Sequence, residues 1–321
     1  MNDLLARLLG FGPVAAPPHV FPLDERALRY ARFVKSGAGW ELREMRRVEL
    51  PADTFQTGLL GGPVRDPAAF QTAVAQLLAV LSAPVREASL VLPDSWQRLA
   101  FVESAELPRS LEQQEEVVRW KVKRLLPFRV EDLRLSWNEV APLANQAEPR
   151  RLLVAYALEP LLAQLESAFA AANVWIGRVV SESLALVPAV GEPLTAAQLG
   201  ALAVVRDGGY TLLFARRGEP VLYRFKALDD SLTPAQRTSA TERDLRLTRA
   251  FVAEQLPDLA LERVVLVAPV EATREWQEWL QSGLGRAGEP IDALRVPLSS
   301  AERVTWTEVA PLLGAARQEV S

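Results

Sequence analysis

The chain has no cysteine and only one histidine, His19, among its 321 residues. Without thiols it can form no disulfide, no zinc–thiolate site and no cysteine nucleophile. A single imidazole also excludes a metal site built from several histidines within one chain. These absences remove thiol chemistry and histidine-rich metal centres from the functions to be considered.

A long apolar run is missing as well. No stretch of about 18 apolar residues is present, so we expect no transmembrane helix. The first residues, MNDLLARLLGFGPVAAPPHV, lack the basic start and apolar centre of a signal peptide, which predicts a cytoplasmic chain. Their leucines share one helical face, which fits either a helix docked on its own domain or a helix that contacts a membrane surface or a partner. These leucines are Leu4, Leu5, Leu8 and Leu9.

Charge and composition are ordinary for a soluble globular protein, with 24% charged and 49% hydrophobic residues. The length is sufficient for two domains with separate cores. The net charge of −4 gives no general attraction to nucleic acid. A basic stretch at 119–129 lies near Trp120 and Phe128, but acidic residues precede it and its cations are spread over more than one helical face. We therefore expect no nucleic-acid partner.

Residues 107–137, LPRSLEQQEEVVRWKVKRLLPFRVEDLRLSW, predict a helix, a sharp corner and a strand. Ser110 and Gln113 have the spacing of a capping box, in which each side chain satisfies a backbone N–H at the helix start. Acidic residues follow in the first turns and basic residues in the last turns, as the helix dipole favours. Pro127 cannot continue the helix, so we expect the helix to end just before it. Val130 to Trp137 then predict a short strand.

This corner resembles the inserted subdomain of the PilM family, the actin-like proteins of type IV pilus assembly. The similarity extends in order and spacing over about residues 19–298 and includes the segment RLLVAYALEPLLAQLESAFAAANVWIGRVVSESLALVPAV. The residues of the corner that carry it are Trp120, Lys121, Leu126, Pro127, Phe128, Val130, Glu131, Leu133 and Trp137.

The hydrophobic patterns predict an alternation of strands and helices along the chain. In the first part we expect strands at 19–33, 40–48, 88–92, 97–102, 130–137, 151–157 and 174–180, and helices at 66–81, 110–126, 160–172 and 183–190. After Gly191 we expect strands at 201–205, 210–215, 220–225, 263–267 and 294–297, helices at 241–256 and 272–284, a polar loop at 231–240, and a partly loose helical tail from Thr305.

Two such units around a cleft describe an α/β, actin-like (ribonuclease-H-like) two-domain fold with an inserted α+β subdomain. The expected boundaries are 19–92 and 173–192 for the first actin-like domain, 93–172 for the insertion, and 193–321 for the second domain.

Actin-like proteins bind ATP with two phosphate loops and an adenine loop, and the chain departs from all of these motifs. Pro22 and Asp24 stand where the family has an Asp-x-Gly pattern, although Arg29 lies near the family's lysine. In the second loop Val205 and Asp207 replace the expected Asp and Gly; a slip by two residues would place Asp207-Gly208-Gly209 on the motif. The adenine loop would be Ala268-Pro269-Val270, without glycine.

These departures favour a scaffold without ATP hydrolysis, a pseudo-ATPase that needs no cofactor. A Mg²⁺–phosphate site requires a carboxylate for the metal and glycine-backed amides for the phosphate, and the expected positions supply neither. ATP binding through altered contacts is the alternative.

The resemblance implies a cytoplasmic scaffold peripheral to the inner membrane, in a type IV pilus assembly platform. It implies that the N-terminal peptide of a PilN-like bitopic membrane protein lies in a groove between the first domain and the insertion. Membrane contact would come only through this partner, and pilus motor ATPases are further candidate partners. The groove candidates are Pro127, Phe128, Trp137, Leu153 and Tyr156.

Two other functions stay open at this point. A platform protein of type II secretion resembling GspL would share the fold, although such chains normally continue into a membrane helix and this sequence shows none. An active actin-like ATPase or a sugar-kinase-like enzyme would require nucleotide affinity despite the altered loops.

Overall fold

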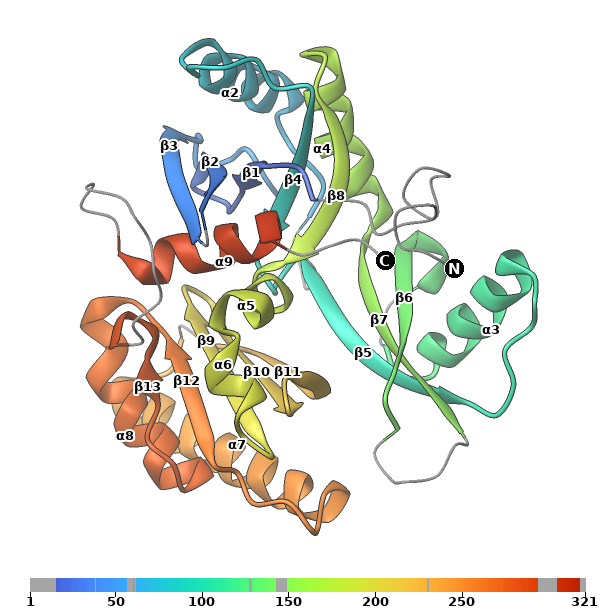
Figure 1. Cartoon of the computed structure of the whole chain (residues 1–321), viewed down its shortest axis with the longest axis vertical. Helices are drawn as coiled ribbons and strands as arrows, with labels where there is room; N and C mark the ends of the chain where they lie inside the picture. The colour runs from blue at the N-terminus through green and yellow to red at the C-terminus, as the bar shows by residue number, and fades with distance from the viewer. Residues whose placement is uncertain are drawn as a thin grey trace.

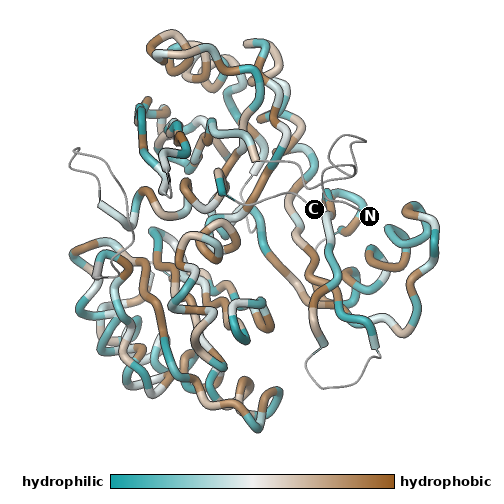
Figure 2. The backbone as a smooth tube through the Cα atoms, in the orientation of Figure 1, coloured by the Kyte–Doolittle hydropathy of each residue, from teal (hydrophilic) through white to brown (hydrophobic). Residues whose placement is uncertain are grey.

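The computed structural model describes residues 16–37, 39–56, 60, 62–126, 129–142, 149–229, 231–293 and 305–317. Within these ranges the strands form two five-stranded sheets and one three-stranded sheet (Figure 1). Apolar residues run along the strands, and β12 (Arg263–Val267), a parallel strand of the second large sheet, is hydrophobic over most of its length (Figure 2).

The first sheet has the order β3-β2-β1-β4-β8. Its first three strands form an antiparallel meander. β4 pairs with β1 in parallel, and β8 pairs with β4 in parallel. Helices α2 (Pro67–Ala79) and α4 (Glu159–Ala171) pack on the same core as the strands of this sheet. The strands are β1 (His19–Pro22), β2 (Ala27–Ser36), β3 (Gly39–Glu49), β4 (Glu87–Leu92) and β8 (Trp175–Ser181).

The second sheet repeats this topology, with the order β11-β10-β9-β12-β13. It again combines an antiparallel meander with two strands parallel to the first. Helices α7 (Pro234–Gln255) and α8 (Thr273–Leu284) cover one face. The remaining strands are β9 (Gly200–Arg206), β10 (Gly209–Arg216), β11 (Glu219–Ala227) and β13 (Glu289–Pro290), with short helices η2 (Val270–Ala272) and η3 (Ile291–Ala293).

Two helices each pack on the sheet of the other half of the molecule. Helix α5 (Glu182–Val190) follows the first sheet but buries apolar residues against the second one, next to the short α6 (Glu192–Thr195). Helix α9 (Trp306–Arg317) follows the second sheet but covers the free face of the first. The two helices cross at Gly314, whose Cα lies against the backbone of Ala185. Each half is therefore completed by a helix from the other.

The inserted unit is a three-stranded sheet of order β5-β7-β6 with helix α3 (Leu111–Lys123) packed on one face. The expected helix and strand are present as α3 and β6 (Leu133–Val140), and the short helix η1 (Val130–Asp132) occupies the predicted start of the strand. The expected Pro127–Phe128 corner lies outside the described residues. The other strands are β5 (Gln97–Ser104) and β7 (Arg150–Leu158). Helix α4, which the expected boundaries assign to the insertion, contributes Leu161 and Phe169 to the core of the first sheet.

Some local expectations differ from the structure. Ser110 is the N-cap of α3 but makes no side-chain capping bond, so the predicted capping box is wrong. Gln114 instead donates to the carbonyl of Pro108 at 2.7 Å. The predicted polar loop at 231–240 is also wrong from Pro234 onward, because α7 starts there behind a capping box formed by Thr233 and Gln236.

The expected tail helix exists as α9, which is buried along most of its length rather than loose. The predicted strand at 294–297 lies outside the described residues. Among the described helices, none combines the length and the hydropathy that crossing a bilayer requires.

Candidate nucleotide cleft and interdomain site

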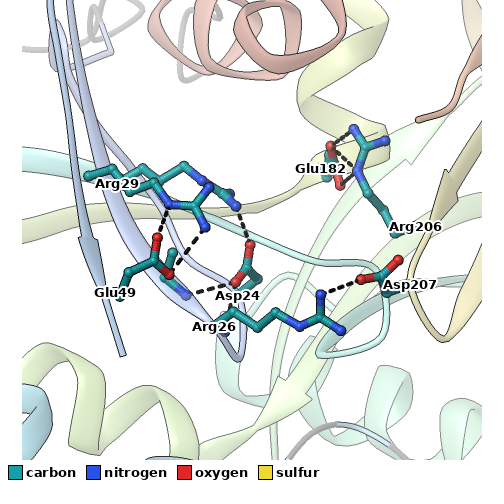
Figure 3. Close-up of polar contacts among 9 residues, drawn as sticks. Asp24, Arg26, Arg29, Glu49, Glu182, Arg206 and Asp207 are labelled. Carbon is teal, nitrogen blue, oxygen red and sulfur yellow. Dashed lines mark hydrogen bonds and ion pairs between the residues drawn. The ribbon is translucent and has the colours of Figure 1, made fainter. Parts of the chain in front are cut away.

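The repeated topology places the β1–β2 and β9–β10 turns, the two expected phosphate loops, opposite each other. The Arg26 guanidinium of the first turn lies 2.9 Å from the Asp207 carboxylate of the second (Figure 3). Because both side chains are about three-quarters exposed, at 76% and 75%, this ion pair joins the two turns at the molecular surface. The space where an actin-like protein would hold phosphate is bridged by the chain's own charges.

Asp24 supplies an internal anion to the first turn. Its Oδ1 accepts the backbone N–H of Arg26 at 2.8 Å and that of Ala27 at 2.9 Å. Its Oδ2 lies 2.7 Å from the Arg29 guanidinium (Figure 3). Backbone amides and a nearby cation are the groups that bind phosphate in a nucleotide loop. Here a carboxylate of the same chain occupies them.

Pro22 ends β1 and has no N–H to offer. It is buried and aligned with Val91 of β4, and the next amide, that of Leu23, donates to the Val91 carbonyl at 3.0 Å. The first loop therefore uses its backbone for the fold and for Asp24. The amides of Leu23, Arg26 and Ala27 therefore all have acceptors within the chain.

The second turn is a tight hairpin. Val205 lies in β9 and is only 3% exposed, so it belongs to the core of the second sheet. Asp207 and Gly208 connect β9 to β10, and Gly208 has φ +80°, the left-handed conformation that glycine adopts most easily. The slipped reading of Asp207-Gly208-Gly209 thus coincides with a hairpin turn, whose carboxylate pairs with Arg26.

A second ion pair lies next to the β9–β10 turn. Arg206, at the end of β9, donates through Nε to both carboxylate oxygens of Glu182 at 3.0 and 3.1 Å (Figure 3). Glu182 begins α5, so this pair links the two halves. On the adenine side, Ala268 and Pro269 lead into η2, and Val270 is 74% exposed.

The Arg26–Asp207 ion pair is expected to contribute little to stability, because both partners are well hydrated. In a double-mutant cycle of Arg26→Ala and Asp207→Ala, chemical unfolding should give a coupling free energy of about 0.2–1 kcal/mol at low salt. About 1 M NaCl should abolish it. A coupling well above 1 kcal/mol would contradict the open geometry of the pair.

A buried polar cluster behind these turns was not predicted from the sequence. Asp94 follows β4, is 5% exposed, and accepts the Ser183 hydroxyl at 2.6 Å. Burial raises the pKa of Asp94 from 3.8 to about 7; the Glu182 carboxylate also raises it, whereas hydrogen bonds from Ser183 and Thr211 lower it. Burial likewise raises the pKa of Tyr223 well above its usual value, with Asp94 as the next cause.

This cluster joins parts of the chain that are far apart in sequence. Asp94 belongs to the first half, Ser183 to α5, and Thr211 and Tyr223 to the second sheet. The sequence signal for this cluster was an acidic residue, Asp94, two positions after a buried parallel strand, at the end where such sheets often place functional groups.

Among the groove candidates that the structure describes, Trp137, Leu153 and Tyr156 belong to different clusters. Trp137 is half-buried against the core beneath α3. Leu153 packs in the cluster between the halves. Tyr156 is 5% exposed and lies in a small cluster with Leu60, which comes from the connection between β3 and α2. Pro127 and Phe128 lie outside the described residues.

No protein-family model matches the sequence, and neither does any curated protein sequence. Solved structures do resemble the fold. One described as the PilM–PilN type IV pilus biogenesis complex has a TM-score of 0.71 and 19% identity, over 95% of this chain and 97% of that chain. The cytoplasmic domain of EpsL, an inner-membrane component of the type II secretion system of Vibrio cholerae, has a TM-score of 0.50 and 13% identity, over 94% and 96%. The predicted actin-like two-domain fold and its resemblance to PilM are confirmed at the level of the fold.

Proposed function

We propose that the chain is a non-hydrolysing scaffold of a type IV pilus assembly platform on the cytoplasmic face of the inner membrane. The observation that carries the loss of ATP chemistry is the contact set of Asp24, whose carboxylate occupies the amides of Arg26 and Ala27. A phosphate entering this turn would have to displace a covalently attached anion that already has its hydrogen bonds.

The proposed partner is the N-terminal cytoplasmic peptide of a PilN-like membrane protein, and the membrane is reached only through it. Support comes from the fold, which is similar to that of PilM in a structure described as a PilM–PilN complex. The proposed groove lies between the first domain and the insertion, where Leu60 contacts the cluster of Tyr156 and Leu133. Pilus motor ATPases are further proposed partners.

Calorimetric titration tests both parts of this proposal. Mg-ATP at about 1 mM should give no binding heat, whereas a synthetic peptide from the cytoplasmic tail of a PilN-like protein of the same organism should bind with micromolar affinity. Saturable ATP binding would overturn the pseudo-ATPase assignment. Absence of peptide binding would overturn the proposed partner and leave the assignment of the phosphate loops intact.

A second candidate is a platform protein of type II secretion. It is favoured by the similarity to the EpsL cytoplasmic domain, which has the lower TM-score of 0.50. Deletion of the gene separates the two functions. Loss of surface pili with normal protein secretion supports the pilus platform, and the reverse phenotype supports the secretion platform.

A further inference from the structure

A cleft of about 590 Å³ lies between the insertion and the second half of the molecule. On one side it is lined by residues 101–103 of β5 and by the end of α3; on the other it is lined by residues 221–223 of β11 and by α7. Successive side chains of a strand point to opposite faces of its sheet. A cleft that touches consecutive residues of a strand must therefore run along the strand's edge.

Both strands are edge strands. β5 ends the three-stranded sheet and β11 ends the second large sheet. On the β11 side, the Arg151 guanidinium donates to the Val221 carbonyl, so this part of the edge has a partner. Within the described residues, β5 pairs with β7 alone. The two edges lie alongside each other, and the Arg98 guanidinium of β5 lies 4.3 Å from the centroid of the Phe225 ring of β11.

The cleft is basic although the chain carries a net charge of −4. Lys121 and Arg124 line it from α3, and each lies over the ring of Trp120, at 5.5 and 5.4 Å. Neither forms an ion pair within the described residues. Glu103 is the acidic residue among the lining side chains, against three cations including Arg151.

Arg151 is the buried member of this set. It is 5% exposed, its guanidinium lies 4.0 Å from the Phe101 ring centroid, and its Nη1 has no hydrogen-bond partner. Burial lowers the pKa of Arg151 to about 10, so the group keeps its charge at neutral pH. A buried cation with an unused donor favours an anionic neighbour.

Apolar side chains frame the same opening. Leu125 at the end of α3 is 56% exposed, and Phe251 on α7 is 47% exposed. They belong to opposite walls of the cleft. Exposed apolar groups beside a basic edge are typical of a protein interaction site rather than of a solvated surface.

We propose that this cleft binds an extended, acidic segment of a partner protein. Its carboxylates meet Lys121 and Arg124, and its apolar side chains meet Leu125 on one wall and Phe251 on the other. This site is separate from the groove proposed for the PilN-like peptide, because it lies between the insertion and the second half.

Fluorescence anisotropy tests the proposal with a labelled peptide of about ten residues that alternates aspartate and leucine. The full chain should bind it with a Kd of about 10–100 μM, and a peptide alternating lysine and leucine should not bind. The double variant Lys121→Glu/Arg124→Glu should weaken binding by about tenfold or more. Phe251→Ala should weaken it independently of salt.

Two matched variants serve as controls. Arg274→Glu reverses a charge that is 91% exposed on α8, and Trp175→Ala removes an aromatic that is 70% exposed on β8; both should bind normally. The proposal is overturned if the acidic peptide fails to bind, or if the charge-reversed variant binds it as well as the controls do. If Lys121→Glu/Arg124→Glu instead abolishes binding of the PilN-like peptide, the cleft is the PilN site and no second site exists, while the proposed function stands.

Discussion

Gly314→Val is expected to disrupt the contact between α5 and α9 and to destabilise the whole chain. A Cβ at this position would lie 1.7 Å from the carbonyl oxygen of Ala185 and 3.2 Å from the Cβ of Ala189. The near neighbour is helix backbone, so relief requires the helices to move apart. Each helix covers a different sheet, and both cores would lose packing. We expect a loss of about 3 kcal/mol or more in the free energy of unfolding, measured by urea denaturation.

Gly39→Ala is the matched control for this variant. A Cβ at Gly39 would meet its nearest atom, the Ser36 carbonyl oxygen, at 3.9 Å, which is ordinary van der Waals contact. Its free energy of unfolding should stay within about 0.5 kcal/mol of the wild type. If Gly314→Val also stayed within that range, the close crossing of the two helices would be wrong.

Asp94→Asn is expected to stabilise the chain above about pH 7 and to have no effect below about pH 4. Between 3.8, the ordinary pKa, and about 7, the folded chain holds the Asp94 proton while the unfolded chain releases it. The folded state therefore binds more protons in this window, and the wild type loses stability as pH rises through it. A difference of about 3 pKa units corresponds to about 4 kcal/mol. The amide keeps an oxygen that can accept the Ser183 hydroxyl.

Urea unfolding of wild type and variant across this pH range measures the effect as the gap between two curves. Other carboxylates act with the opposite sign; hydrogen bonds from Ser82, for example, hold the pKa of Glu44 below its usual value despite burial. The contributions of these other carboxylates are the same in wild type and variant, so they cancel when the two free energies of unfolding are subtracted. A gap that does not grow from pH 4 to pH 7 would rule out a buried, protonated Asp94.

Most elements could be predicted because their apolar residues repeat with the period of a helix or a strand. The start of α7 could not, since Pro234 to Ala240 are polar and mostly exposed. Its signal was the cap itself, Thr233 with Gln236. The capping box predicted at Ser110 failed because spacing alone does not determine whether a side chain turns toward the helix.

The sequence patterns could not predict that α5 packs on the second sheet and α9 on the first. An apolar stripe such as Val309, Leu312 and Ala316 shows that a helix face is buried, but not which sheet covers it. The departures of Pro22 and Asp24 from the family's pattern are visible in the sequence. That the Asp24 carboxylate caps its own turn, and that Arg26 reaches Asp207, depend on tertiary geometry.

The exchange of helices also constrains how the protein is made. The strands of the first sheet leave the ribosome early, yet the helix that covers one of their faces is residues 306–317. Until that segment is synthesised, no helix covers Val20 and Phe33, and the nascent chain exposes an apolar face of the sheet. The core of the first domain therefore stays incomplete until residues 306–317 have been synthesised.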